Sequence, residues 1–302
     1  MYIRKKNDTT LQVTQPNTLL PFLTEKMSAT RTTAKQWLSH RLIQVNGATQ
    51  TRHDFNLNSG DKVTLLRQKG NACLTHPKLK LIYEDDDLMV VEKKEGLLTV
   101  PTHPESRETT ALSILRAYVK KQNSQANVYV VHRLDRETSG LLVFAKQQDI
   151  QQYMRTYWRQ LVTQRTYIAV AEGQFDKKEG EIRSWFTEDK RNAMVYSSPV
   201  DDGGDLAITY YKVLKEKTDS NGSTYSLVEL HLQTGRTNQI RVHLASKGCP
   251  VLGDRKYGHG NNNSPIDRLC LHAQVLEFIH PATEQTLHFE TPLPKPFTNF
   301  FK

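Results

Sequence analysis

The stretch VHRLDRETSGLLVFAK, from Val131 to Lys146, decides how this chain is interpreted. Its two ends read as buried β-strand, because VYVV leads into it and LLVFA lies near its close. Between them, HRLDRETSG carries a dense set of charged side chains. Burying a polar group without partners costs about 2–7 kcal/mol, and burying an ion costs more. Such a loop is either a salt-bridged corner or a functional site, and the rest of the chain has to decide between them.

The composition is that of a globular protein with a basic N-terminal part. The chain has 302 residues, 37% hydrophobic and 24% charged, enough for one large domain or two smaller ones. Its net charge of +9 is concentrated in residues 1–70, where eleven Lys and Arg face four Asp and Glu; the remaining 30 and 28 nearly cancel. We interpret the basic part as a polyanion-binding module joined to a separate working domain. A merely basic, soluble surface explains the charge equally well.

The sequence carries no signal for a membrane or for export. Apolar runs such as LLVFA are far shorter than the ~20 residues of a membrane-spanning helix. The start, MYIRKKNDTT, lacks the apolar core of a signal peptide. Cys73, Cys249 and Cys270 are widely scattered, which suits neither a disulfide framework nor a cysteine metal site. We expect a cytoplasmic protein with no membrane contact.

The basic N-terminal part has its own pattern of elements. Thr30 or Thr32 is suited to cap a short helix whose buried stripe holds Ala34, Trp37 and Leu38, with Arg41 following at the same spacing. A strand, LIQV, then ends in Asn-Gly, the strongest short turn signal. A second turn and strand follow in SGDKVTLL.

This order of elements resembles the S4 RNA-binding domain over residues 16–68. Arg41 stands where the S4 pattern usually has Gly, so we expect a differently shaped helix end. Arg31 and Lys35 lie one turn apart on an open helix face. The resemblance implies that Arg31, Lys35 and Arg41 contact RNA.

We expect three segments: an S4-like domain over residues 1–69, a linker over 70–79, and a second domain over 80–302. The second domain reads as helices over 107–122 and 148–161, mostly loop and hairpin over 173–205, and many strands, including a hairpin at Asn221-Gly222. Hairpins outnumber βαβ units. The predicted class is therefore α+β, with a mixed, mainly antiparallel central sheet flanked by helices.

Three polar segments interrupt this β-rich domain. The first is the opening loop, in which we expect Asp135 to be the reactive carboxylate. The second is Tyr167 in RTYIAV, and the third is LHLQTGRTNQIRVHLASKGCPVLGD over 230–254. In the third, Thr237 is suited to cap a helix beginning at Asn238, and Arg241 and Leu244 share one face of that helix.

These motifs, together with RLCLHAQVLEFIHP, resemble in order and spacing the large-subunit class of RNA pseudouridine synthases over residues 80–290. The resemblance implies that Asp135 is the catalytic aspartate, acting on the ribose so that the base detaches, turns over and reattaches through C5. It implies that Arg133 fills the gap left by the flipped uridine and that Tyr167 stacks on the base. Arg241 is implied as the partner of Asp135, and Leu244 as an apolar wall of the base pocket.

Elementary chemistry agrees with these roles. Flipping a stacked uridine costs a few kcal/mol, and a buried aspartate stays ionised only beside a cation. The planar fork of an arginine holds a carboxylate better than a lysine does. We expect no cofactor and no metal, and a monomer that acts on ribosomal or transfer RNA without an obligate protein partner.

Two residues depart from the family pattern: Asn238 stands where His is usual, and Lys94-Glu95 replaces a proline-containing turn before Gly96. We expect altered loop contacts from the first and a looser turn from the second. Two other functions stay open at this point. One is a non-catalytic RNA-binding or ribosome-assembly factor on the same scaffold, and the other is a hydrolase with Asp135 as its nucleophile.

Overall fold

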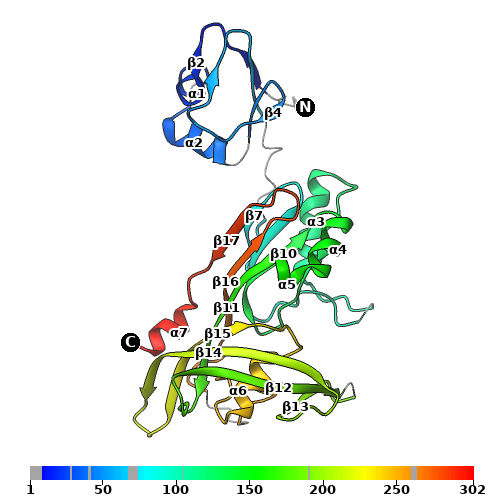
Figure 1. Cartoon of the computed structure of the whole chain (residues 1–302), viewed down its shortest axis with the longest axis vertical. Helices are drawn as coiled ribbons and strands as arrows, with labels where there is room; N and C mark the ends of the chain where they lie inside the picture. Colours follow the sequence, from blue (N-terminus) through cyan, green and yellow to red (C-terminus); the bar gives the residue numbers. More distant parts are fainter. Residues whose placement is uncertain are drawn as a thin grey trace. The chain divides into compact units, whose positions relative to one another are not determined.

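The computed structural model describes residues 9–27, 29–39, 42–66, 74–103, 105–189, 191–259 and 264–302. The chain forms two compact units, residues 1–73 and 74–302 (Figure 1). Each unit has its own hydrophobic core, and each is described by itself.

The N-terminal unit packs two helices against a small antiparallel sheet of order β1-β6-β3-β4. The predicted Asn-Gly turn is confirmed, because Asn46 and Gly47 both have positive φ (52° and 85°) and join β3 to β4. Strand β1 pairs with β6 and lies outside the expected core of 16–68. The elements are β1 (Thr9–Gln12), β2 (Asn17–Thr18), α1 (Leu19–Lys26), α2 (Arg31–Ser39), β3 (Ile43–Val45), β4 (Ala48–Thr49), β5 (Asn56–Leu57) and β6 (Lys62–Leu65).

The larger unit is organised around one long sheet, which confirms the predicted mixed, mainly antiparallel class. Among the described residues, eleven strands join it in the order β13-β12-β14-β15-β11-β16-β10-β8-β7, with β17 beside β16 and β9 beside β10. Of the strand pairs in the described part of this sheet, only β10–β16 is parallel. The strands are β7 (Leu79–Glu84), β8 (Leu88–Lys93), β9 (Tyr129–Val130), β10 (Ser139–Ala145), β11 (Val162–Glu172), β12 (Glu179–Asp189), β13 (Met194–Ser198), β14 (Asp205–Thr218), β15 (Thr224–Leu232), β16 (Leu271–Ile279) and β17 (Thr286–Glu290).

Helices flank this sheet (Figure 1). They are α3 (Ala111–Gln122), α4 (Gln148–Thr156), α5 (Trp158–Leu161), α6 (Gln239–Ser246) and α7 (Lys295–Phe300). The helix expected over 107–122 begins later, because Thr110 and Ser113 form a capping box that fixes its start. The single helix expected over 148–161 is two helices, which are separated at Tyr157. None of the helices in the described ranges is long and apolar enough to cross a membrane.

One further expectation was confirmed and one was wrong. The hairpin expected within 173–205 is the antiparallel pair β12 and β13, where buried Ser184 completes an alternating inward face that its polarity concealed. Helix α6 is preceded by Asn238 in the left-handed conformation (φ 55°) rather than capped by Thr237. Asparagine tolerates this backbone conformation better than most residues do.

The core places the charged loop opposite α6. All seven residues of β10 are buried, and this strand packs with β8, β16 and α4. At its start, Gly140 has φ of 120°, and a Cβ there would lie 2.2 Å from the backbone oxygen of Ala273. Only glycine allows β10 and β16 to approach this closely. On the other side, Val242 anchors α6 against β12, β13 and β14.

Candidate active site

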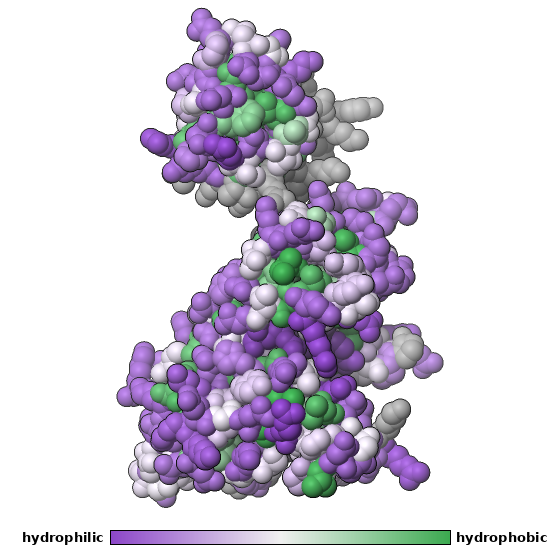
Figure 2. All heavy atoms as spheres, viewed as in Figure 1, coloured by the Kyte–Doolittle hydropathy of each residue, from purple (hydrophilic) through white to green (hydrophobic). Residues whose placement is uncertain are grey.

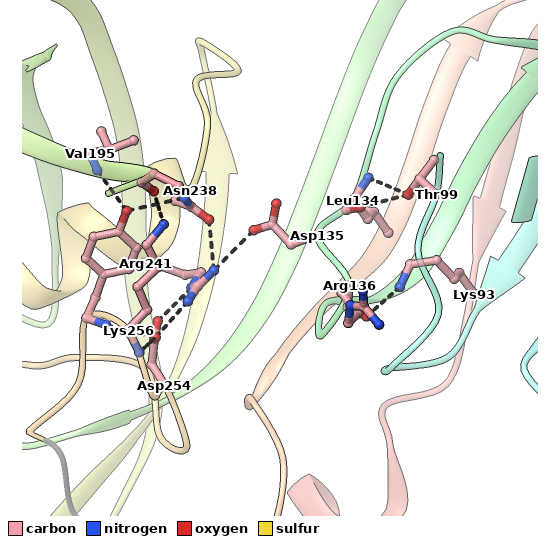
Figure 3. Close-up of polar contacts among 12 residues, drawn as sticks. Lys93, Thr99, Leu134, Asp135, Arg136, Val195, Asn238, Arg241, Asp254 and Lys256 are labelled. Atoms are coloured by element: carbon pink, nitrogen blue, oxygen red, sulfur yellow. Dashed lines mark hydrogen bonds and ion pairs between the residues drawn. The ribbon is translucent and has the colours of Figure 1, made fainter. Parts of the chain in front are cut away.

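Asp135 lies on the loop between β9 and β10, and the backbone on both sides of it is fixed. The hydroxyl of Thr99 donates to the oxygen of Leu134 at 2.7 Å and accepts from its nitrogen at 3.2 Å. The nitrogen of Gly96 donates to the oxygen of Arg136 at 2.9 Å. Leu134 is buried, whereas the Asp135 side chain keeps 40% of its surface exposed. The loop therefore presents one carboxylate to solvent from a rigid base (Figure 3).

Lys93 supports this loop from inside the protein. Its side chain is fully buried, and its Nζ donates to the backbone oxygens of Lys94 (3.1 Å), Leu97 (2.8 Å) and Arg136 (3.0 Å). Burial lowers the pKa of Lys93 to about 7, although three carbonyl acceptors match the three donors of an ammonium. The turn at Lys94 and Glu95 thus holds the Asp135 loop without the proline that the family pattern has there.

The start of β10 is fixed by a second buried polar group. Ser139 Oγ accepts from Arg268 Nη2 at 2.7 Å and lies 2.8 Å from His272 Nδ1. The other ring nitrogen of His272 lies 3.0 Å from the hydroxyl of Thr291. Burial, together with the charge of Arg268, lowers the pKa of His272 to about 4, so the ring is neutral. These contacts link the start of β10 to β16 and to the segments just before β16 and just after β17.

Arg241 faces Asp135 from α6, but its main partner is Asp254. Its Nε and Nη2 donate to the two Asp254 oxygens at 2.7 and 2.8 Å, while Nη1 donates to Asn238 Oδ1 at 2.8 Å (Figure 3). Nη1 also lies 3.5 Å from Asp135 Oδ2. Arg241 therefore meets Asp135, its expected partner, through one contact, and its two-point hold is on Asp254 instead. The Asp254 carboxylate holds the Nε and Nη2 side of the guanidinium, and the remaining amino group, Nη1, points at the Asp135 carboxylate.

Asp254 was missed by the sequence reasoning, although it is the last residue of the polar segment quoted over 230–254. Its side chain is fully buried. Burial raises the pKa of Asp254, but the hydrogen bonds and charge of Arg241 outweigh burial and hold that pKa below its ordinary value. The Asp254–Arg241 pair is therefore ionised at neutral pH. The glycine-aspartate pair after the predicted helix was the available signal for a functional aspartate. Nothing in its spacing identified Arg241 as the partner of Asp254.

The turn that carries Asp254 also contacts the β12–β13 hairpin. The hydroxyl of Tyr257 accepts from the nitrogen of Val195 at 3.0 Å and from Asn238 Nδ2 at 3.3 Å. The Arg241 guanidinium lies 5.1 Å from the centre of the Tyr257 ring. Asn238 thus bridges Arg241 and Tyr257, so the residue that departs from the family pattern is part of the support for Arg241.

Tyr167 lies in the middle of β11 with 9% of its surface exposed. The pairing of β11 with β16 shifts register between Thr166 and Tyr167, which re-aims the side chain locally. Burial raises the pKa of Tyr167, partly offset by Arg165, so its hydroxyl is protonated at neutral pH. It provides a flat face and a hydrogen-bond donor rather than a phenolate.

These groups meet in a cleft of about 950 Å³. Arg133, Asp135, Tyr167 and Arg241 line it, and Figure 2 shows strongly hydrophilic side chains gathered across the middle of this unit. Leu244 differs from the expectation. It is fully buried and does not belong to the lining described, where Ile240 and Leu271 provide apolar surface instead. Its position on α6 directs the Leu244 side chain toward the hydrophobic core and away from the cleft.

The charges of the opening loop are not buried together. Arg133 and Arg136 are exposed, and Arg136 pairs at the surface with Glu108 at 2.9 Å. In the other unit, Arg31 and Lys35 are exposed on α2, while Arg41 lies outside the described residues. The loop is charged because it forms the wall of a cleft.

The site and sheet belong to a known class. Residues 87–246 match the RNA pseudouridylate synthase family, and this chain belongs to the RNA pseudouridine synthases. It is therefore an isomerase that modifies RNA, which sets aside both the hydrolase and the non-catalytic binding factor.

The chain is similar to several proteins of this family. It is 34% identical over 285 residues to the uncharacterized RNA pseudouridine synthase YhcT of Bacillus subtilis, covering 93% of this chain and 91% of that protein. It is 29% identical over 310 residues to ribosomal large subunit pseudouridine synthase D of Nitrosomonas europaea, covering 96% and 86%. The solved structure of human RNA pseudouridylate synthase domain containing 4 is similar with a TM-score of 0.57 and 26% identity, covering 72% of this chain and 90% of that one.

Proposed function

We propose that this enzyme converts specific uridines of large-subunit ribosomal RNA to pseudouridine, with Asp135 as the catalytic residue. The observation that carries the assignment of Asp135 is its carboxylate, which projects from a rigid loop into the cleft 3.5 Å from Arg241 Nη1. The choice of RNA is supported by the name of the Nitrosomonas europaea relative, a ribosomal large subunit pseudouridine synthase. Transfer RNA is the alternative substrate.

The proposed reaction begins with a uridine flipped out of its stack into the cleft, where Arg133 takes its place in the RNA. Asp135 acts on the ribose as nucleophile or base, and the bond between N1 and C1′ breaks. The uracil ring turns while it stays stacked on Tyr167. A bond then forms between C5 and C1′, the proton on C5 is lost, and N1 gains a proton. No atom is gained or lost overall, so no cofactor is needed.

Arg241 contacts and positions the Asp135 carboxylate in this scheme. Because Asp254 already neutralises much of its charge, Arg241 binds Asp135 through a single long contact. That arrangement leaves one Asp135 oxygen free to approach the ribose. Tyr167, which is protonated, orients the base by stacking and by donating a hydrogen bond.

The N-terminal unit serves as an S4-like RNA-binding domain in this proposal. The exposed side chains of Arg31 and Lys35 on α2 would contact phosphates, together with Arg41. Such contacts contribute affinity without sequence specificity, and they weaken steeply as salt increases. Replacing Arg31 and Lys35 with Gln should therefore weaken RNA binding and lower the salt slope by roughly one for each phosphate that the protein no longer neutralises.

A pseudouridine map of all cellular RNA tests the function directly. The comparison is between cells with the gene intact, deleted, and restored as wild type or as Asp135→Ala. Discrete sites should disappear on deletion, return with the wild type and stay absent with the variant. Loss of sites only in transfer RNA would replace the proposed substrate. Sites that return with Asp135→Ala would remove Asp135 from the catalytic role.

A further inference from the structure

The cleft extends well beyond the Asp135–Arg241 pair. At about 950 Å³ it lies near the upper end of the roughly 300–1,000 Å³ typical of small-molecule pockets. We call the part lined by Asp135, Tyr167 and Arg241 the first end of the cleft, and the part lined by Arg155, Trp158 and Arg159, at the junction of α4 and α5, the second end. A flipped uridine at Asp135 gives the residues of the first end a role and leaves those of the second end without one.

The second end is built around a flat stack. The half-buried ring of Trp158 lies against His132, with ring centres 4.7 Å apart. The guanidinium carbon of Arg165 lies 5.9 Å from the centre of the same indole. Arg165 is fixed in turn, because its Nη2 donates to the backbone oxygens of Leu232 (3.2 Å) and Thr234 (3.4 Å). Indole and guanidinium planes are the surfaces on which unpaired bases stack.

The ring of His132 does not supply charge to this stack. Its Nε2 accepts a hydrogen bond from the nitrogen of Val143 at 3.1 Å, which requires that nitrogen to be unprotonated. Burial, together with the charge of Arg165, lowers the pKa of His132 to about 3. His132 therefore acts as a neutral support for Trp158.

The cleft also carries an excess of positive charge. Six arginines line it: Arg133, Arg155, Arg159, Arg165, Arg236 and Arg241. Arg241 is already neutralised by Asp254, and Arg236 lies 3.1 Å from a carboxylate oxygen of Asp205. Within the described ranges, no carboxylate is within ion-pair distance of the other four. Unpaired cations that line one cleft repel one another, and an anion bound between them would relieve that repulsion.

We propose that the Trp158 end of the cleft is a binding site for the nucleotide next to the target uridine. The base of that nucleotide lies against the Trp158–Arg165 stack, and its phosphate lies between Arg155 and Arg159. A neighbour that occupies this site cannot remain base-paired. The preferred substrate is therefore RNA whose target uridine has an unpaired neighbour, as in a loop or bulge, rather than a continuous duplex. This inference rests on the proposed function for its choice of RNA.

Binding of short uridine oligonucleotides tests the site without turnover. Wild-type protein should bind the trinucleotide UpUpU at least about 10-fold more tightly than uridine monophosphate, because stacking and phosphate contacts are added. Arg159→Gln should lose most of that gain. Lys120→Gln, which removes one exposed charge on α3 outside the cleft, should keep it. An equal gain in both variants, or no gain in the wild type, would overturn the site.

Kinetics with a modified RNA test the base contact. The RNA is a fragment around a uridine found by the mapping experiment, with each neighbouring base removed in turn. Removal of the base on one side of the target uridine should raise KM on the order of 10- to 100-fold, and so should Trp158→Leu with the intact RNA. In both cases kcat should stay within about twofold of the value for wild-type protein and intact RNA. Together they should be no worse than either alone, and Trp158→Phe should recover much of the loss.

The outcomes separate the two proposals. If Trp158→Leu and the missing base raise KM independently, so that their factors multiply for both neighbours, the Trp158 site is overturned. Pseudouridine formation by the wild type would still leave the proposed function standing in that case. If the wild type forms no pseudouridine in the RNA, the proposed function fails. The oligonucleotide measurement then still decides whether the Trp158 site exists.

Discussion

Replacing Asp254 with Asn should both destabilise the larger unit and slow the reaction. The Asp254 side chain is fully buried and holds Arg241, itself only 13% exposed, through bonds of 2.7 and 2.8 Å. Removing one member of a buried ion pair costs about 3–5 kcal/mol, because the other charge is left uncompensated. For a unit of this size, each kcal/mol lowers Tm by about 2–4 °C, so we expect a decrease of about 6–20 °C.

The effect on turnover follows from the loss of orientation. With Asn at position 254, Arg241 loses the paired charge and one of the two acceptors that hold its Nε and Nη2, so its guanidinium can shift. Displacement of a group by about 1 Å from its working position costs on the order of 100-fold in rate. The expected result is a large fall in kcat with a smaller change in KM. Release of tritium from RNA labelled at C5 of uridine measures it, because the proton on C5 is lost in the reaction.

A matched control and a pH series complete this test. Asp267→Asn makes the same substitution at a fully exposed carboxylate, 3.7 Å from Arg255, and should change neither Tm nor kcat. The pKa of Asp254 is lower folded than unfolded, so its contribution is present above about pH 4 and is lost as pH falls further. The stability gap between wild type and Asp254→Asn should therefore narrow in acid. An Asp254→Asn variant with wild-type Tm and kcat would refute the holding role of Asp254.

Three further substitutions in the same region have distinct expected outcomes. Gly140→Ala should abolish stable folding in a thermal melt, since the added Cβ would lie 2.2 Å from the Ala273 oxygen. The pKa of Lys93 is about 7 in the folded protein, below its ordinary 10.5, so between these values the unfolded chain binds one proton more than the folded chain. In denaturant titrations, the free energy of unfolding of the wild type should therefore rise between about pH 7 and 10 relative to that of Lys93→Met. Asn238→Ala should lower the single-turnover rate about 10-fold, because it removes the acceptor that lies 2.8 Å from Arg241 Nη1. Asn238→His should restore the rate. A rate for Asn238→Ala equal to that of the wild type would contradict a positioning role for Asn238.

Local elements and the class of the protein could be predicted from the amino-acid sequence. The Asn-Gly turn at 46–47 and the apolar run of β10 depend on neighbouring residues, so their patterns were sufficient. The ordered motifs around Asp135, Tyr167 and Arg241 pointed to the pseudouridine synthases, and the family match agrees. The same patterns misled where polarity hid burial, as at Ser184, which completes the inner face of β12 beside His243.

The partners of the site residues, in contrast, depend on tertiary packing. That Asp254 holds Arg241, that Lys93 reaches the Asp135 loop, and that Leu244 faces the core all follow from how distant segments pack. Spacing along a chain specifies which face of one helix or strand a residue occupies, but not which element covers that face. The second end of the cleft at Trp158 has the same origin, because it joins the α4–α5 junction to β11. Such pairings arise from burial of the whole core, and no local pattern encodes them.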